Sequence, residues 1–381
     1  MTALDLTGLD TRPSQVWGAV RLVPLVREQP VEDLRLHPRI LTDGPSVVQA
    51  GPRHAYVSYI PHAFVATWTG DGTPAAAYGT QLAEGADDAR PATGALRMHR
   101  RMARREAKGR LRFLPLHLAL EGYLALHFGG PSVAWEEWSQ RALRRGLSPR
   151  AEEAYTGAEV RGLADALRVF EIHPGQCGVL LYVADALAAA FVVPHPDDYR
   201  ALHPTLVQDL YGELVHHYAT LMPPVPEFRA RIPGTGIRSL AELRAAAAGQ
   251  ERAWARFHDT TMAAALLEQP RTWRTVYRMG PFTLSRFLPE FRPGRENHIG
   301  EAVTDRRGRT VYLKTFRLSE SQARRGHLLD RLAAHDWHLA RTAAALGVDE
   351  AQLGRRLDSA GFGSLLRQDV LDGHRARART R

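Results

Sequence analysis

Two short stretches bring carboxylates and imidazoles together in a pattern that can carry acid–base or metal chemistry. Glu171 and His173 precede a Pro-Gly pair, and their alternate positions place both on one side of a predicted strand. His195, Asp197 and Asp198 follow in a predicted loop. Such a cluster can bind a metal ion or serve as general acid and base. The alternative interpretation is that Asp197 or Asp198 caps the helix that follows.

A basic run between residues 97 and 112 is the second candidate for chemistry. Five of its cations recur at helical spacing and predict a helix with one strongly positive face: Arg97, Arg101, Arg104, Arg105 and Lys108. Arg101 and Arg105 would hold phosphate groups if this helix lay beside the carboxylate–histidine cluster, and together they would form a ligand pocket. A solvated helix face that pairs with nearby carboxylates is the favoured alternative.

Several sequence patterns of known chemistry are absent. The chain has no His-Glu-x-x-His, no Gly-x-Gly-x-x-Gly and no phosphate-binding Gly-Lys-Ser/Thr run. Its single cysteine, Cys177, excludes an internal disulfide and a cysteine-based zinc site, and its apolar surroundings predict a core residue. The sequence therefore predicts no metal and no cofactor, and a non-enzymatic role is favoured over an enzymatic one.

The elements that would position these residues follow from hydrophobic periodicity and turn residues. Residues 14–100 contain short β-branched and aromatic runs, with Asp71-Gly72 as a hairpin signal. Residues 166–193 again predict strands that meet at tight turns. Residues 222–236 are rich in Pro and Gly and predict a linker. An Ala-rich helical region then extends to about Leu267, and residues 271–317 form a basic, β-like segment.

The predicted fold class is α+β, with four parts. They are an α+β domain over residues 1–221, a linker and Ala-rich helix over 222–270, the basic segment over 271–317, and a helical domain with a basic tail over 318–381. The first residues lack the basic start and apolar core of a signal peptide. The longest apolar run, residues 179–193, is too short to span a bilayer. We therefore expect a cytoplasmic protein with no membrane association.

The stretch from Leu328 to Phe362 has the pattern of short helices joined by a tight turn. Apolar residues recur at helical spacing up to Leu346, and Gly347 can take the left-handed conformation that ends a helix. Asp349 is placed to cap the next helix, and Gly361 supplies its end. This pattern predicts a helix-turn-helix, in which the second helix of the pair enters the major groove of DNA.

The same stretch resembles the DNA-binding end of Fis and of NtrC-type activators. The matching residues are His338 to Ala343, Leu346-Gly347-Val348, Leu353, Arg355, Arg356, Leu357 and Gly361. Three residues depart from that pattern, because Gly354 weakens a helix interior and Glu350 and Asp358 add negative charge. The resemblance implies a DNA-binding protein, and the match covers about a tenth of the chain.

The distribution of charge also favours DNA. The formal net charge of the chain is +9. Residues 271–381 hold 22 Lys and Arg against 12 Asp and Glu, whereas residues 1–270 hold 28 against 29. A positive domain attracts polyanions, and neutralised phosphates supply most non-specific DNA affinity. The predicted DNA contacts are Arg341, Thr342, Gln352, Arg355 and Arg356, with base edges assigned to Gln352 and Arg356.

The first 220 residues carry a second resemblance. The runs VWGAVRLVPLV, RLRFLPLHLALEGYLALHFGGP, FEIHPGQCGVLLYVADALAAAFVVPHPDDYR and DLYGELV resemble an uncharacterised bacterial domain associated with ADP-ribosylglycohydrolases and rhodanese-phosphatases. This resemblance brings no catalytic residues with it. By association, it implies a ligand related to ADP-ribose or nucleotides.

Together these patterns predict a bacterial transcriptional regulator. Its first domain would be a sensor or an oligomerisation unit, and its active form would be a homodimer because one half-site contact is weak. Two alternatives remain open. One is an enzyme or binding module for a nucleotide-like ligand, with a polar pocket around Glu171, His173, His195 and Asp197. The other is an interaction protein whose helical tail binds another protein.

Overall fold

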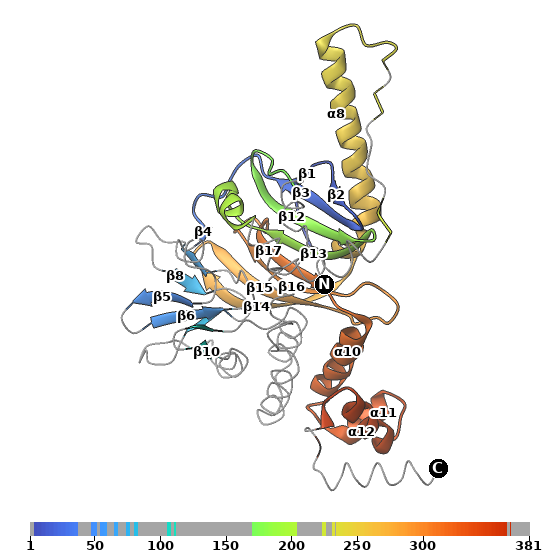
Figure 1. The fold of residues 1–381 in the computed structure, drawn as a ribbon. Coiled ribbons are helices and arrows are strands. Elements are labelled where there is room, and N and C mark those ends of the chain that lie inside the picture. Colours follow the sequence, from blue (N-terminus) through green and yellow to red (C-terminus); the bar gives the residue numbers. More distant parts are fainter. Residues whose placement is uncertain are drawn as a thin grey trace.

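The computed structural model describes the chain in several ranges. These are residues 4–36, 47–51, 54–58, 65–67, 74–76, 80–82, 105–107, 110–111, 170–203, 223–225, 231–232, 234–363 and 366. Figure 1 colours these residues along the sequence and labels many of their helices and strands.

Nine of the described strands form one sheet in which every pairing is antiparallel (Figure 1). The order across the sheet is β1-β3-β12-β13-β17-β16-β15-β14, and β2 also pairs with β3. The strands are β1 (Asp10–Thr11), β2 (Gln15–Trp17), β3 (Val20–Val26), β12 (Gln176–Val183), β13 (Ala186–Val192), β14 (Arg271–Met279), β15 (Phe282–Pro289), β16 (His298–Thr304) and β17 (Thr310–Arg317).

Tight turns connect consecutive strands of this sheet, as the sequence predicts. Ala184 and Asp185 join β12 to β13, and both have positive φ angles, of 48° and 61°. Two residues of positive φ are what a two-residue hairpin turn of the mirror type requires, because its twist matches that of the strands. Gly280 (φ 57°) lies between β14 and β15, and Gly308 (φ 81°) lies between β16 and β17. The strands predicted within residues 166–193 and 271–317 are thereby confirmed.

The predicted boundary between residues 1–221 and the basic segment 271–317 is wrong in one respect. Strand β17 pairs directly with β13, with Phe191 opposite Lys314 and Val192 opposite Leu313. Strands β14 to β17 therefore complete the same sheet as β3, β12 and β13 and do not form a separate unit. The Pro- and Gly-rich stretch 222–236 suggested this boundary, but strand pairing joins the segments before and after it in one sheet.

Shorter strands form three smaller sheets within residues 35–111. One contains β4 (Arg35–Leu36), β7 (Val65–Thr67) and β8 (Pro74–Ala76), and another contains β5 (Val47–Gly51), β6 (His54–Ser58) and β9 (Thr80–Leu82). The predicted hairpin at Asp71-Gly72 lies outside the described residues, but the flanking strands β7 and β8 pair antiparallel. The β character predicted for residues 14–100 is confirmed for these strands.

The third small sheet corrects the prediction of a charged helix for residues 105–107, the part of the run 97–108 that the structure describes. Strand β10 (Arg105–Ala107) pairs antiparallel with β11 (Arg110–Leu111). The helical spacing of the cations predicted one positive face, but a strand alternates its side chains with a period of two. The cations of this run therefore do not line up on a single helix face at its C-terminal end.

One cluster of the hydrophobic core lies between the large sheet and the segment 240–268. This segment contains α8 (Leu240–Phe257), the π-helix η2 (His258–Met262) and α9 (Ala264–Glu268), so the predicted Ala-rich helical region is confirmed. Trp254 of α8 and Leu266 of α9 pack with Leu180, Tyr182 and Phe287 of the sheet. The indole N–H of Trp254 also donates to the carbonyl of Arg12 at 3.1 Å. The N-terminal part of α8 projects away from the sheet (Figure 1).

Three helices follow β17: α10 (Glu320–Ala334), α11 (Leu339–Ala345) and α12 (Glu350–Ser359). They lie at the end of the molecule opposite to the projecting part of α8 (Figure 1). Helix α10 begins with a capping box in which Ser319 and Gln322 bond to each other's backbone N–H. The mixed α+β class is confirmed. Among the described residues, no helix is both long and apolar enough to cross a bilayer.

Candidate functional site

The predicted acid–base pair Glu171 and His173 does not lie on a strand. Strand β12 begins later, at Gln176, after the turn at Pro174-Gly175. Glu171 is exposed, and its backbone N–H and C=O bond to the Gln15 side chain at 2.6 and 2.8 Å. The backbone N–H of His173 donates to the Gln176 side chain at 2.9 Å. These contacts fix the backbone before β12, and the predicted strand geometry is wrong here.

The second half of the predicted cluster begins a helix. The helix starts at Pro196, so Asp197 and Asp198 lie in its first turn and neither precedes it as a cap. His195 takes that place instead, because its Nδ1 accepts from the backbone N–H of Asp197 at 3.1 Å. Asp198 is buried and accepts two hydrogen bonds from Arg35, at 2.8 and 3.1 Å. This fork-shaped contact raises the pKa of Arg35 and gives Asp198 a structural role.

Only part of the predicted ligand pocket falls on described residues, and the pocket stays a prediction. Arg101 lies outside them, and Arg105 lies in β10. His195 has two carboxylates near it, with Glu32 at 3.5 Å and Asp197 at 3.6 Å. Even so, the described part of the chain contains no group of three His, Cys, Asp or Glu side chains that could hold a metal ion.

Cys177 is a core residue, as its sequence context predicts. Its side chain is fully buried, and burial raises the pKa of its thiol to about 11. A thiol with so high a pKa is almost entirely protonated at neutral pH, and the thiolate is the reactive form. Cys177 therefore has the properties of a packing residue.

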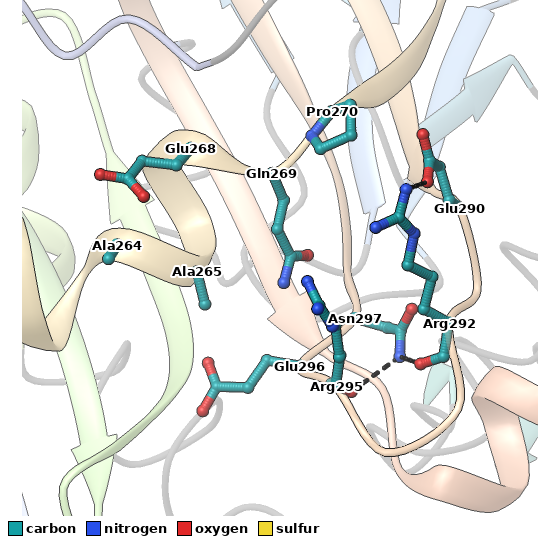
Figure 2. Close-up of a pocket in the computed structure, with 10 residues that line it drawn as sticks. All are labelled: Ala264, Ala265, Glu268, Gln269, Pro270, Glu290, Arg292, Arg295, Glu296 and Asn297. Atoms are coloured by element: carbon teal, nitrogen blue, oxygen red, sulfur yellow. Dashed lines mark hydrogen bonds and ion pairs between the residues drawn. The ribbon is translucent and has the colours of Figure 1, made fainter.

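A cavity of about 290 Å³ lies between α9 and the loop that joins β15 to β16 (Figure 2). Its lining is mixed in charge, with residues from α9, from the two-residue link between α9 and β14, and from the β15–β16 loop. These residues are Ala264, Ala265, Glu268, Gln269, Pro270, Glu290, Arg292, Arg295, Glu296 and Asn297. Sequence reasoning did not find this cavity, because its residues come from separate elements and follow no motif.

The loop beside this cavity is held in shape by hydrogen bonds and by ion pairs, which include Arg292 with Glu290 and Arg317 with Glu296. The Asn297 amide donates to the carbonyls of Arg292 and Arg295, both at 2.9 Å (Figure 2). Glu296 lies 3.1 Å from Arg317 and 3.4 Å from the imidazole of His298. Burial alone would raise the pKa of Glu296, but the His298 contact and the Arg317 charge lower it below its usual value.

The same loop is the point at which the C-terminal helices attach to the sheet. The carbonyl of Asn297 accepts from the backbone N–H of Leu318 at 2.7 Å, just before α10. Phe291 of the loop packs so closely on Gly326 of α10 that a Cβ at residue 326 would lie 2.1 Å from its ring. The cavity therefore shares its loop with the junction to α10.

Two oppositely charged side chains are buried within the large sheet. Glu301 of β16 and Lys314 of β17 lie directly opposite each other, and both are fully buried. Tyr312 donates to Glu301 at 3.2 Å. Burial lowers the pKa of Lys314 to about 7. Because burial denies solutes access to this pair, it has the character of a structural cluster.

A buried chain of hydrogen bonds holds the π-helix against the sheet. The Tyr182 hydroxyl lies 2.7 Å from Nε2 of His258, and Nδ1 of His258 lies 2.9 Å from Asp259. Tyr182 and His258 are fully buried, whereas Asp259 is half exposed. Sequence reasoning missed this trio because the three residues share no motif. π-Helical turns occur often at functional sites, but here the chain of contacts serves to dock η2.

The turn between α11 and α12 has the predicted geometry. Gly347 has a φ of 64°, its N–H bonds to Ala344, and the N–H of Val348 bonds to Ala343 at 3.0 Å. These two bonds satisfy carbonyls at the end of α11. Asp349 then caps α12, because its side chain accepts from the N–H of Gln352 at 2.6 Å. The predicted stop at Gly347, the cap at Asp349 and the stop at Gly361 (φ 88°) are confirmed.

The predicted DNA contacts differ in their access to solvent. Arg341, Arg355 and Arg356 are exposed, and Gln352 is half-buried. Thr342 is fully buried, and its hydroxyl donates to the carbonyl of His338 at 2.9 Å. The side chain of Thr342 therefore packs inside the helical unit and has no access to a DNA surface. The sequence alone did not distinguish Thr342 from the exposed predicted contacts, because exposed and buried positions follow each other closely along a short helix.

The basic excess of residues 271–381 does not lie on the three helices. Residues 320–359 hold six Lys and Arg and six Asp and Glu, so their formal charge is balanced. Several arginines of the strands are engaged within the sheet or its loops, including Arg271, which is buried and bonds to backbone carbonyls. The charge asymmetry of the chain is therefore weaker support for DNA binding by α12 than the sequence suggested.

Comparisons with known proteins give one match. No curated protein and no solved structure matches this chain. One family model, that of ARPP-2, matches residues 4–280, which include β1 to β14 and the segment from α8 to α9. The matched range ends at the turn between β14 and β15 and covers more than half of the chain. On this evidence, the chain belongs to the ARPP-2 family.

Proposed function

We propose that the protein binds DNA through its C-terminal helices, with α12 as the helix that enters the major groove. One observation carries the proposal. Arg355 and Arg356 are exposed on α12, whereas Leu353 and Leu357 of the same helix are fully buried. Helix α12 is thus anchored by its apolar side and presents two adjacent guanidinium groups on the other.

The geometry of α11 and α12 supports a helix-turn-helix. The two helices are seven and ten residues long and are separated by Leu346 to Asp349. Ala343 of α11 and Leu353 and Leu357 of α12 are buried, as expected for two short helices that share one small core. The resemblance to Fis and NtrC-type proteins falls on the same residues, and it favours α12 as the recognition helix.

The proposed contacts are a subset of those predicted from sequence. Arg355 and Arg356 can reach base edges or phosphates, since arginine forms paired hydrogen bonds with guanine and with phosphate oxygens. Gln352 lies one turn before Arg356 and is half-buried, so it suits an adenine edge. Arg341 is exposed on α11 and suits a phosphate contact. Thr342 is left out because it is buried.

Two acidic residues moderate the affinity of this surface. Glu350 is exposed in the first turn of α12, where a carboxylate favours the helix N-terminus but repels phosphate. Asp358 is half-buried near the other end. We therefore expect weak binding by a single copy. A homodimeric, cytoplasmic transcription regulator fits this expectation, with the ARPP-2 part of the chain as sensor or oligomerisation unit.

The test compares two double variants that each remove two adjacent arginines. Arg355→Ala/Arg356→Ala removes the proposed contacts from α12. Arg306→Ala/Arg307→Ala is the matched control, because both arginines are exposed in the turn between β16 and β17. Binding of the intact chain and of both variants to genomic DNA fragments is measured at rising salt concentration.

We expect the α12 variant alone to lose affinity. Each lost arginine contact should cost about 1–3 kcal/mol, and lost phosphate contacts should also reduce the salt dependence by about one unit of slope each. Equal binding by the intact chain and the α12 variant would refute the proposal. Equal loss in both variants would show that binding follows total charge, which would also refute a specific role for α12.

A second candidate function is a ligand-binding module, and the cavity beside the β15–β16 loop favours it. Its volume of about 290 Å³ is at the lower end of the range for small-molecule sites. Arg292 and Arg295 can contact an anionic group, and Glu268 and Gln269 can accept hydrogen bonds. A nucleotide-related ligand in this cavity would contact the β15–β16 loop, which packs against α10 through Phe291.

A thermal-shift screen of the intact chain with nucleotides, NAD and ADP-ribose tests this candidate. A ligand that binds the native state raises the unfolding temperature, and the rise grows with the logarithm of the ligand concentration relative to Kd. Arg295→Ala, in the cavity, should abolish the shift, whereas the control Arg306→Ala should retain it. No shift with any of these compounds, or an equal shift in both variants, would exclude the cavity as their site.

A further inference from the structure

The β15–β16 loop contacts the cavity on one side and α10 on the other. Its residues that line the cavity are Glu290, Arg292, Arg295, Glu296 and Asn297. The ring of Phe291, between two of these residues in sequence, is buried and packs on Gly326 of α10. A change on the cavity side of the loop can therefore reach α10 through the next residue in the chain.

Phe291 adopts a backbone conformation that a bulky residue seldom takes. Its φ angle is 50°, in the left-handed region that favours glycine. Such a conformation costs free energy, persists only where surrounding contacts hold it, and occurs often in switch regions. Here the contact with Gly326 holds the ring, so the conformation of the loop and the position of α10 depend on each other.

A second path of contacts passes through Asn297. Its amide donates to the carbonyls of Arg292 and Arg295, both at 2.9 Å. Its own carbonyl accepts from the N–H of Leu318 at 2.7 Å, one residue before the cap of α10. We call α10 seated when it has this bond at its start and the contact with Phe291. Asn297 thus joins the two arginines of the cavity to the start of α10.

These two arginines give the cavity affinity for an anion. Among the residues that the structure describes, Arg295 forms no ion pair, and Figure 2 shows its guanidinium pointing toward the Gln269 side chain. The guanidinium of Arg292 is turned toward Glu290, with which it pairs. Arginine binds phosphate oxygens through paired hydrogen bonds, so two guanidinium groups from one loop suit the two phosphates of a diphosphate.

The carboxylates of the lining leave this affinity in place. Glu296 lies 3.1 Å from Arg317, which neutralises its charge. Glu268 is exposed at the end of α9, where water and salt screen its charge. A ligand phosphate therefore competes mainly with Glu290, for the guanidinium of Arg292. That exchange would act on the two residues that flank Phe291.

We propose that a small molecule with a diphosphate group binds this cavity and keeps α10 seated. The inference rests on the second candidate function, ligand binding at the cavity, and adds its regulation. A ligand shifts an equilibrium only by the difference in its affinity for two states. The bonds from Asn297 hold the backbone of both arginines beside one cavity while α10 is seated, so the ligand favours that state. The strained backbone of Phe291 favours release.

The seated state also fixes the C-terminal helices relative to the sheet. Helices α11 and α12 follow α10 in the chain, so a ligand that holds α10 would restrict the position of α12. Only this consequence depends on the proposed binding of DNA. The binding of a diphosphate and the seating of α10 can be measured without DNA.

Calorimetric titration of the full chain with inorganic pyrophosphate, at constant ionic strength, tests the binding. Hydrogen exchange of the α10 amides, with and without pyrophosphate, tests the coupling. At about ten times Kd, exchange of these amides should slow by about tenfold, because the ligand stabilises the seated state alone. Arg295→Ala should abolish both effects. The control Arg306→Ala, in the turn between β16 and β17, should retain both.

Coupling between two sites is reciprocal, so a change in α10 should alter the affinity for pyrophosphate. Gly326→Ala brings a Cβ to 2.1 Å from the ring of Phe291 and should weaken the seating. Although residue 326 is not part of the cavity lining, Kd should rise by at least about fivefold, the lower end of usual coupling. The matched control Gly249→Ala, in α8, should leave Kd unchanged. Circular dichroism confirms that each variant is folded.

The outcomes separate the regulation from the ligand binding on which it rests. Pyrophosphate that binds without slowing exchange in α10, or an unchanged Kd in Gly326→Ala, would overturn the regulation and leave ligand binding intact. No binding of pyrophosphate, or equal losses in Arg295→Ala and Arg306→Ala, would overturn the diphosphate site itself. Coupling in a chain without DNA affinity would contradict only the proposed DNA binding.

Discussion

The packing of Phe291 on Gly326 makes a prediction that opposes the helix propensity of the residues. Gly326 lies inside α10, where replacing glycine by alanine ordinarily stabilises a helix by about 1 kcal/mol. Here the new Cβ would lie 2.1 Å from Cε1 and 2.4 Å from Cδ1 of Phe291. The ring cannot simply turn away, because Phe291 is 98% buried at the junction of α10 with the sheet.

We therefore expect Gly326→Ala to destabilise the protein. Overpacking a tight contact costs about 1–3 kcal/mol, which exceeds the gain from helix propensity. On a Phe291→Ala background the overlap is absent, so the same substitution should then stabilise the protein by up to about 1 kcal/mol. The sign of the effect should thus reverse, and this double-mutant cycle isolates the contact from the cost of Phe291→Ala itself.

The assay is urea unfolding of the full chain, followed by circular dichroism, for the wild type and the three variants. Gly249→Ala is the matched control, because it lies in α8 and its Cβ would approach only the end of the Arg252 side chain, at 4.0 Å. The Gly249→Ala variant should raise the free energy of unfolding, because alanine favours a helix more than glycine does. If Gly326→Ala also raised it, in the presence of Phe291, the proposed steric conflict would be refuted.

Two further predictions concern a helix cap and a buried histidine. Asp349→Ala should lower the free energy of unfolding by about 1 kcal/mol, because the N–H of Gln352 loses its acceptor. Asp349→Ser should recover most of this loss, and equal stability of all three proteins in urea would contradict the capping role. Burial lowers the pKa of His203 to about 4, so the folded state disfavours its protonation. The unfolded chain binds this proton below about pH 6.5, so the stability that depends on neutral His203 is present above that pH. This contribution to the free energy of unfolding should decline by up to about 3 kcal/mol as the pH falls toward 4. The difference in unfolding free energy between the wild type and His203→Gln, measured at pH 7 and 4.5, should show this decline, and a pH-independent difference would refute it.

Local sequence patterns predicted the C-terminal helices well because their ends depend on neighbouring residues. Gly347 and Asp349 act through backbone groups three to five residues away, and both were identified from residue type and position alone. The turns of the large sheet were predictable for the same reason. By contrast, the cap before Tyr199 was assigned to an aspartate, although His195 occupies that position.

The candidate site was predicted less well because access and proximity depend on distant parts of the chain. Thr342 and Arg341 are neighbours in sequence, yet one is buried and the other exposed. The cavity between α9 and the β15–β16 loop joins residues whose spacing carries no signal. The predicted positive helix failed at Arg105, where cross-strand pairing in β10 and β11 replaced helical hydrogen bonds.

The sequence by itself determined the α+β class, the turns between paired strands and the capped helices at the C-terminus, since these features rest on short-range hydrogen bonds and on the periodicity of apolar residues. Only the tertiary structure decided that β13 pairs with β17, which unites the first part of the chain with residues 271–317 in one sheet. It also decided which arginines are buried, and that one loop both lines the cavity and contacts α10. The physical reason is that strand order and burial are set by the packing of segments far apart in the chain, and no local pattern records which segments will meet.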